Sequence, residues 1–308
     1  MISNLLIPAV LFFAIGFFAQ VVRSDLKFPA DLAKADFGAA VDAVVAALAL
    51  GVLLPLLAYA GLRWLGRIDP LNSSAIAAHY GSVSAGTFLT ALAFLEVQGV
   101  NYEKYPIIML AIMESPAIII GLLLAKFSRG GQGQSEAGSH AGVGELLRDA
   151  FTNGSVILLF GAILVGVIAT PSSLQKVMPF YDGIFMGVLS LFLLEMGMEA
   201  AKRIGEFRRV GMFLVGFGII MPLIGGAIGL WVGHSMLGFS AGGVTLVAVL
   251  AASASYIAVP SAMRLAIPEA NPSFYLTLSL GVTFPFNVIF GIPLYYEIAQ
   301  WLAGYAAE

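Results

Sequence analysis

The stretch Ser82-Val83-Ser84-Ala85-Gly86-Thr87 interrupts an apolar segment with small and hydroxylated residues. In the other half of the chain, Ser253-Ala254-Ser255-Tyr256-Ile257-Ala258-Val259-Pro260-Ser261 interrupts an apolar segment in the same way. Backbone that leaves helical geometry inside a membrane has unpaired N–H and C=O groups, unless protein or a wet cavity satisfies them. Paired interruptions in corresponding places of two halves are typical of the binding site of a transporter.

The composition predicts a membrane protein. Hydrophobic residues make up 59% of the 308 residues and charged residues only 11%, whereas a soluble domain carries roughly 25% charged residues. We therefore expect an all-α polytopic membrane protein without a soluble domain. The net charge of −3 is too small to indicate a nucleic-acid partner. The absence of cysteine excludes disulfides, thiol catalysis and Cys-ligated zinc.

Long apolar runs with few charges predict membrane spans. We predict nine, at 4–22, 40–62, 74–97, 105–127, 152–170, 178–199, 209–235, 240–262 and 273–303. The first lacks a basic leader region and a cleavage site, so we expect a span rather than a removed signal. The last contains Pro285 and Pro293 and is expected to be kinked or broken.

The distribution of basic residues predicts the orientation of the spans. Lys and Arg gather in the loops at 63–73, 126–151 and 200–209. The positive-inside rule places these loops in the cytoplasm and the C-terminus outside, with the chain in the cytoplasmic (inner) membrane. The basic residues of 23–39 do not fit this simple count of spans.

The two halves of the chain share short motifs in the same order. The matching pairs are 51–55 with 218–222, 79–84 with 250–255, 101–105 with 271–275, and Pro116 with Pro285. We therefore divide the chain into a first repeat (1–127), a cytoplasmic linker (128–147) that is rich in Gly, Ser and Gln, and a second repeat (148–308).

The predicted spans also give the relative direction of the two repeats. Spans 40–62 and 209–235 match and lie five spans apart in the predicted order. Because five is an odd number, the two spans cross the membrane in opposite directions. This predicts an inverted-repeat secondary transporter with crossing interrupted helices. The first repeat has one span fewer than the second. Because 24–39 is short and charged, its second span is predicted to be missing or shortened.

The two interruptions are the candidate substrate site. An interrupted helix exposes free N–H groups and the positive end of its dipole, which together attract an anion. The candidate substrate-binding residues are Ser82, Val83, Ser84, Gly86, Thr87, Ser253, Ala254 and Ser255. The alternative is that small residues let the helices pack closely while the hydroxyls bond back to their own helix.

Glu114 lies in the middle of a predicted span, where an ionisable residue is costly and usually functional. It could coordinate a cation or carry a proton, or it could be a neutral carboxyl bonded to a nearby hydroxyl. The candidate ion-binding residues are Glu114, Ser84, Thr87, Tyr256, Ser261 and Asn287. We expect no cofactor and no metal other than Na⁺ as a possible coupling ion.

Other polar residues are assigned structural roles. Glu195 and Glu199 are expected to pair with Lys202 and Arg203 at the cytoplasmic interface, with a role in a gate as the alternative. His79 is interpreted as structural, with proton transfer as the alternative. No spacing of His, Asp or Glu suggests a metal enzyme, and the serine-rich motifs lack a nearby base, so we expect no enzymatic activity.

With these motifs the sequence resembles the cyanobacterial sodium-dependent bicarbonate permease family, from Ile76 to about Leu302. The resemblance rests on motifs that occur in order: residues 81–87, 102–103, 114–117, 180–183, 196–200, 203–206, 239–244 and 267–273. It implies ten spans, a gate or scaffold domain (1–39 with 152–208) and a core domain (40–127 with 209–303). In the core, crossing interrupted helices would hold bicarbonate and Na⁺.

The resemblance further implies a homotrimer and a PII-like regulatory protein at the cytoplasmic face. This chain departs from the family pattern in its shortened first repeat and its short linker. It also has Tyr256 where the well-known bicarbonate transporters carry an acidic residue, and Ala254 and Ala258 where they carry hydroxyls. Loss of a carboxylate there should weaken Na⁺ coordination.

The resulting prediction is a secondary transporter that takes up a small anion, with bicarbonate as the best single candidate and Na⁺ as the coupling ion. One alternative is an H⁺-coupled or uncoupled transporter of another small organic anion. Another is a non-transporting relative with an assembly or sensing role.

Overall fold

The computed structural model describes residues 37–130, 171–205 and 211–305. The predicted spans 4–22 and 152–170 lie outside these ranges, as does most of the stretch in which we expect the shortened span. The side chains of 171–185 are also not described.

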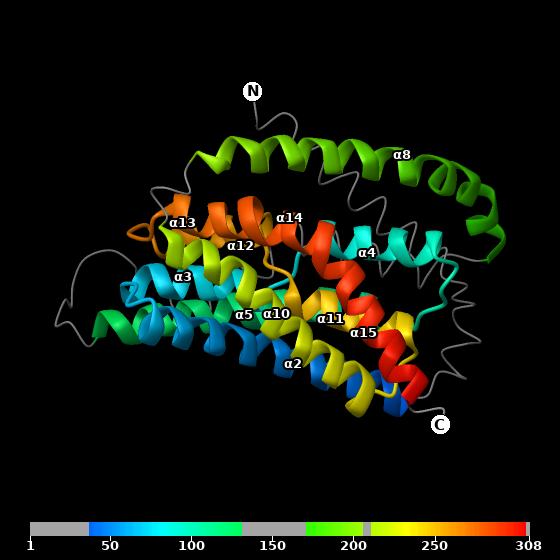
Figure 1. Ribbon diagram of the computed structural model, residues 1–308, viewed down its shortest axis with the longest axis horizontal. Helices are drawn as coiled ribbons and strands as arrows, with labels where there is room; N and C mark the ends of the chain where they lie inside the picture. Colours follow the sequence, from blue (N-terminus) through cyan, green and yellow to red (C-terminus); the bar gives the residue numbers. More distant parts are fainter. Residues whose placement is uncertain (1–36, 131–170, 206–210, 306–308) are drawn as a thin grey trace.

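The described residues form helices and no strands (Figure 1). The first half contains α2 (Phe37–Ala60), η1 (Gly61–Leu65), α3 (Pro70–Gly81), α4 (Ala85–Val97) and α5 (Tyr105–Gly130). The second contains α8 (Pro171–Ile204), α10 (Met212–Trp231), η2 (Val232–Met236), α11 (Ala241–Ala252), α12 (Ala258–Ala266), α13 (Pro272–Leu276), η3 (Thr277–Thr283), α14 (Phe284–Phe286), η4 (Asn287–Gly291) and α15 (Ile292–Tyr305). The η segments are π-helical.

Five helical stretches of the described chain are long and apolar enough to cross a membrane: Gly38–Leu65, Pro70–Val97, Tyr105–Arg129, Met212–Met236 and Pro272–Gly304. They correspond to five of the predicted spans. The predicted span 178–199 lies within α8, and 240–262 corresponds to the shorter α11, a break and α12. These helices indicate a multi-pass membrane protein.

The helices pack in two groups. Helix α3 packs against α2 and α5, and α11 packs against α10 and α15. Helix α8 runs along one side of the molecule and contacts α4 and η3 (Figure 1). The first halves of the two interrupted spans, α3 and α11, therefore belong to different groups. Their second halves, α4 and α12, lead toward the side that α8 covers.

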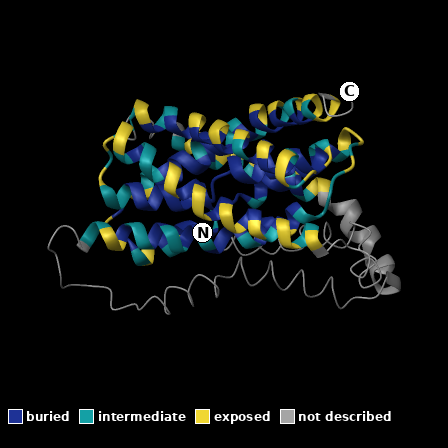
Figure 2. Cartoon of the chain, turned by 90° about the horizontal axis from the view of Figure 1, so that it is seen from below, coloured by how far each residue is buried: buried dark blue, intermediate teal, exposed yellow. Residues whose placement is uncertain are grey.

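Surface and interior differ as expected for a protein in lipid. Buried residues fill the middle of the molecule, while exposed residues line its outer faces (Figure 2). Many exposed side chains are large and apolar, including Trp64, Met212, Trp231 and Trp301. Patches of this kind would be an aggregation hazard in water, but lipid solvates them.

Prolines shape the last span without breaking it. Proline removes a backbone donor and disturbs the helical hydrogen-bond pattern. Pro285 lies in α14, between the π-helical segments η3 and η4, and Pro293 lies at the start of α15. The stretch Pro272–Gly304 is continuous, so the predicted break is absent, and the irregularity consists of the π-helical segments on either side of Pro285. By contrast, Pro116 lies inside an uninterrupted α5.

Helix α5 continues through Gly130, three residues beyond the predicted span 105–127. The first residues of the segment 128–147, which we predict to be a linker, are therefore helical. The remainder of that segment lies outside the described residues.

Glycines allow α10 to touch α11. A Cβ atom on Gly225 would lie 2.1 Å from the Ala251 carbonyl oxygen, and one on Gly229 would lie 2.6 Å from Ala248 Cα. Any side chain at these positions would push the two helices apart. Close approach through small residues is the usual way in which membrane helices associate.

We therefore expect Gly225→Val to destabilise the protein by about 1–3 kcal/mol through overpacking. Gly216→Val on the same helix is the matched control, because a Cβ at Gly216 meets no atom within 4 Å. Thermal unfolding in detergent measures both. Equal melting temperatures for the two variants would contradict this account of the α10–α11 contact.

Candidate functional site

The first predicted interruption is a break in the helix. Helix α3 ends at Gly81 and α4 begins at Ala85, and Ser82 between them is extended (φ −89°, ψ 173°). Ser84 caps α4, since its Oγ accepts hydrogen bonds from Thr87 N (3.1 Å) and Thr87 Oγ1 (2.8 Å). Serine is a favoured N-cap residue because its hydroxyl replaces the acceptor that the first turn lacks. The local sequence thus stabilises a new helix start inside the span.

The second interruption is also a break. Helix α11 ends at Ala252, Ser253 is extended (φ −84°, ψ 164°), and α12 begins at Ala258. Ser253 Oγ donates to the Leu250 carbonyl oxygen at 2.9 Å. Ser255 Oγ accepts a long 3.5 Å hydrogen bond from Val259 N at the start of α12. Each break therefore uses its own serines to satisfy the helix ends beside it.

The two breaks contact each other directly. Ser84 N in the first break donates to Ser253 Oγ in the second at 2.9 Å. Ser255 N in the second break donates to the His79 carbonyl oxygen at the end of α3 at 2.8 Å. Backbone groups that the breaks remove from their helices thus find partners across the contact. Segments distant in sequence form one polar centre within the apolar core.

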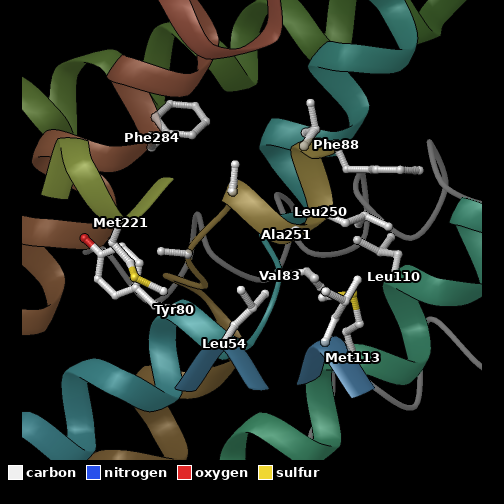
Figure 3. Close-up of a cluster of buried hydrophobic side chains, with 14 of the residues drawn as sticks. Leu54, Tyr80, Val83, Phe88, Leu110, Met113, Met221, Leu250, Ala251 and Phe284 are labelled. Atoms are coloured by element: carbon white, nitrogen blue, oxygen red, sulfur yellow. The ribbon is translucent and has the colours of Figure 1, made fainter. Parts of the chain in front are cut away.

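This polar centre is closed to solvent. Ser82, Ser84, Thr87, Ser253, Ala254 and Ser255 are each exposed by 3% or less. The Val83 side chain instead packs in an apolar cluster near Leu110 and Met113 of α5 (Figure 3). Only the backbone of Val83 is therefore available to a ligand. The other predicted substrate residues are brought together at the meeting of the two breaks.

Within the described part of the chain, three buried side-chain atoms in or beside the breaks make no hydrogen bond: His79 Nε2, Ser82 Oγ and the Tyr256 hydroxyl. The Nδ1 atom of His79 hydrogen-bonds to the Ala75 carbonyl oxygen at 2.6 Å, and its ring stacks on Tyr275 with centroids 4.5 Å apart. Because a carbonyl only accepts, Nδ1 carries the hydrogen, and in the neutral ring Nε2 is left as an acceptor. Unpaired buried polar atoms are few in native proteins and commonly mark a function.

The breaks also combine both polarities of helix end. The last carbonyl groups of α3 and α11 and the first N–H groups of α4 and α12 point into this region without partners in their own helices. The N–H ends carry partial positive charge and favour an anion, whereas the carbonyl ends favour a cation. The site can therefore attract an anion and a cation without a fixed charge.

Glu114 is buried on α5 at 7% exposure. The described residues offer its carboxylate neither a hydrogen bond nor an ion pair, so the alternative of a carboxyl bonded to a neighbouring hydroxyl finds no support. No hydrogen bond joins Glu114 to the two breaks. It stands as a separate polar position in the helix that packs against α2 and α3.

Ser261 and Asn287, two other predicted ion ligands, have local partners. Ser261 is exposed on α12 and its Oγ donates to the Ala258 carbonyl oxygen at 2.7 Å. Asn287 Nδ2 donates to the Ala252 carbonyl oxygen at 2.8 Å, so it satisfies the last carbonyl of α11. Asn287 therefore supports the second break from the last span, whereas the Ser261 hydroxyl bonds back to its own helix.

The structure adds contacts that sequence reasoning missed. The loop after α4 reaches the start of α11, where Ser240 N donates to Glu103 Oε1 at 2.9 Å. The loop after α12 reaches the start of α3, where Asn271 N donates to Asn72 Oδ1 at 2.7 Å. Each interrupted span is thus held at its entrance by the loop that follows the other one. The only sequence signal was that 101–105 and 271–275 match.

At the end of α8 the expected ion pair is confirmed between Glu199 and Lys202. Phe192, on the same helix, packs against the start of α4 near Gly86. The sequence offered no signal for this contact, because Phe192 is one of several similar apolar residues in its segment.

Removing the Ser253 hydroxyl would leave Ser84 N unpaired in the buried centre. We expect Ser253→Ala to cost about 1–3 kcal/mol, the penalty of an unsatisfied buried donor. Ser190→Ala is the control, since the exposed Ser190 hydroxyl only bonds back to Met186 in its own helix. Thermal unfolding of the two variants measures the difference, and no greater loss in Ser253→Ala would refute the cross-break bond.

Comparison with known proteins now adds a family. The model of the Na⁺-dependent bicarbonate transporter superfamily matches residues 30–300, a range that includes both breaks and Glu114. No curated protein matches the chain.

Proposed function

The chain belongs to the Na⁺-dependent bicarbonate transporter superfamily, and from this premise we propose that it is a secondary transporter that takes up bicarbonate with Na⁺ across the cytoplasmic membrane. The observation that carries the proposal is the direct contact between the two helix breaks, Ser84 N to Ser253 Oγ and Ser255 N to the His79 carbonyl. This contact concentrates free helix ends, hydroxyls and unpaired polar atoms at one buried point.

The proposed site places the anion at the N-terminal ends of α4 and α12, with Ser82, Ser84 and Thr87 on one side and Ser253 and Ser255 on the other. The carbonyl ends of α3 and α11 attract Na⁺. A cation beside the anion offsets its charge, which lowers the cost of moving the loaded site through hydrocarbon. Coupling therefore follows from the need to carry a nearly neutral pair.

Two parallels between the halves support inverted repeats with crossing helices as part of the proposal. Both α2 and α10 contain an internal proline and lead into a five-residue π-helical segment before an interrupted span. In addition, the entrance of each interrupted span is held by the loop after the other, through Glu103 and Asn72. Such reciprocal contacts are expected of two repeats around a pseudo-two-fold axis.

Alternating access would move a core (40–127 with 209–303) against a gate or scaffold (1–39 with 152–208). The contacts of α8 with α4 and η3 mark where these parts would slide or part. A homotrimer and a PII-like partner at the cytoplasmic face complete the proposal. They rest on the family resemblance alone.

Proton coupling is the second candidate, and Glu114 favours it. A buried carboxyl without a hydrogen bond or ion pair can hold a proton when it faces one side of the membrane and release it on the other. The same group could instead supply the negative charge of a Na⁺ site. The Na⁺ dependence and the pH dependence of uptake in a Glu114 variant distinguish these two roles.

In proteoliposomes we expect uptake of radiolabelled bicarbonate to rise when a Na⁺ gradient is directed inward at equal pH on both sides. A K⁺ gradient of the same size is the control for ionic strength. Uptake that ignores the Na⁺ gradient would contradict Na⁺ coupling, and absence of uptake under every gradient would contradict transport of bicarbonate.

Glu114→Gln keeps the size of the side chain and removes its charge. Under Na⁺ coupling we expect the Na⁺ concentration for half-maximal uptake to rise by about tenfold, which is 1.4 kcal/mol. Under H⁺ coupling we expect instead that uptake loses its pH dependence. Asp42→Asn, at an exposed position on α2, is the control. A Glu114→Gln protein with unchanged Na⁺ and pH dependence would remove Glu114 from both candidate ion sites.

A further inference from the structure

Tyr256 lies at the meeting of the two breaks with an unused hydroxyl. The residue is 8% exposed, and its buried hydroxyl makes no hydrogen bond of normal geometry to any described residue. The hydroxyl lies near the Ser84 side chain and directly above Gly86, where an added Cβ would be 2.3 Å from the hydroxyl oxygen. The ring is held edge-to-face by Phe284, with centroids 5.3 Å apart. Tyr256 thus crosses from the second break to the start of α4.

The start of α4 offers further donors at this point. Ala85 and Gly86 are its first residues, so their amides precede the first helical hydrogen bond and have no acceptor within the helix. Thr87 N is already used by Ser84 Oγ. Gly86 has no side chain to cover its backbone, and the space that a Cβ would need is taken by Tyr256. A phenolic hydroxyl and two amides therefore lie close together.

Phe192 of α8 closes this point from the outside. An added Cβ on Gly86 would lie 2.8 Å from Phe192 Cε1. Phe192 is 7% exposed, while its neighbours Leu191 and Leu194 are exposed by 68% and 61%. The ring therefore points inward against α4 as its neighbours face outward. Apolar rings around a polar group exclude water and strengthen any hydrogen bond formed there.

We propose that Tyr256 is an anion-binding residue, whose hydroxyl donates a hydrogen bond to a small oxyanion held at the N-terminus of α4. The inference rests on the proposed transport function and specifies one half of its site. The sequence had assigned Tyr256 to the cation. Its position at the positive end of α4 disfavours a cation there, because the helix dipole repels it. A hydroxyl can donate to an anion, which a carboxylate at the same position could not do.

The test compares Tyr256→Phe with the unchanged protein in proteoliposomes at saturating Na⁺. We expect the bicarbonate concentration for half-maximal uptake to rise about tenfold, a loss of 1.4 kcal/mol. At saturating bicarbonate, the Na⁺ concentration for half-maximal uptake should stay unchanged. A purely structural role would lower the melting temperature. The melting temperature of Tyr256→Phe should stay unchanged, because the removed hydroxyl makes no hydrogen bond of normal geometry to the described residues.

Tyr296→Phe is the matched control. Tyr296 is also buried, at 7% exposure, but its hydroxyl accepts a hydrogen bond from Gln300 on α15. This variant should keep the affinity for bicarbonate. The second readout is stabilisation against heat by bicarbonate, nitrate or formate, which the unchanged protein should show and Tyr256→Phe should largely lose.

The outcomes separate this inference from the proposed function. Higher half-saturation by Na⁺ with unchanged affinity for bicarbonate would make Tyr256 a cation ligand and overturn the inference. Unchanged affinity for both ions would overturn it as well, while transport itself stands. If the unchanged protein neither transports nor is stabilised by any of the three anions, the proposed function fails and the inference fails with it.

Discussion

The constraint on which this structure depends is that backbone N–H and C=O groups inside a membrane must find partners. Breaking one span frees several such groups, and no water surrounds them to replace the lost hydrogen bonds. Here the two breaks lie against each other, so that Ser84 N is satisfied by Ser253 Oγ and Ser255 N by the His79 carbonyl. Each break therefore depends on the other for hydrogen bonds that its own helix no longer makes.

The two breaks do not supply hydrogen bonds to every polar atom between them, and the atoms that they leave over indicate a function. Among the residues that the structure describes, none pairs with His79 Nε2, Ser82 Oγ or the Tyr256 hydroxyl in or beside the same centre. A fold selected only for stability would pair these atoms or replace them with apolar groups, since each unpaired atom costs free energy. The remaining capacity for hydrogen bonds is what a transported ion would use. Binding of an ion would therefore supply the hydrogen bonds that the buried site lacks.

Several features were predictable from local sequence because their causes are local. Ser84 is a typical N-cap, so the restart of a helix at Ala85 follows from nearby residues. Pro285 disturbs the helix that contains it. The C-terminal end of α5 was not predicted. The Gly- and Ser-rich composition after residue 127 suggested a linker, but the helix continues to Gly130. Propensity is a weak guide at such boundaries.

By itself, the sequence determined that the chain spans a membrane, where its helices are interrupted, and which residues are too polar for their surroundings, because hydropathy and helix breaking act over a few residues. Only the tertiary structure decided that Tyr256 covers Gly86, that Phe192 points inward from α8, that Asn287 supports Ala252, and that Ser261 faces outward. These relations join residues far apart along the chain, so they depend on how whole helices pack, which no local pattern encodes.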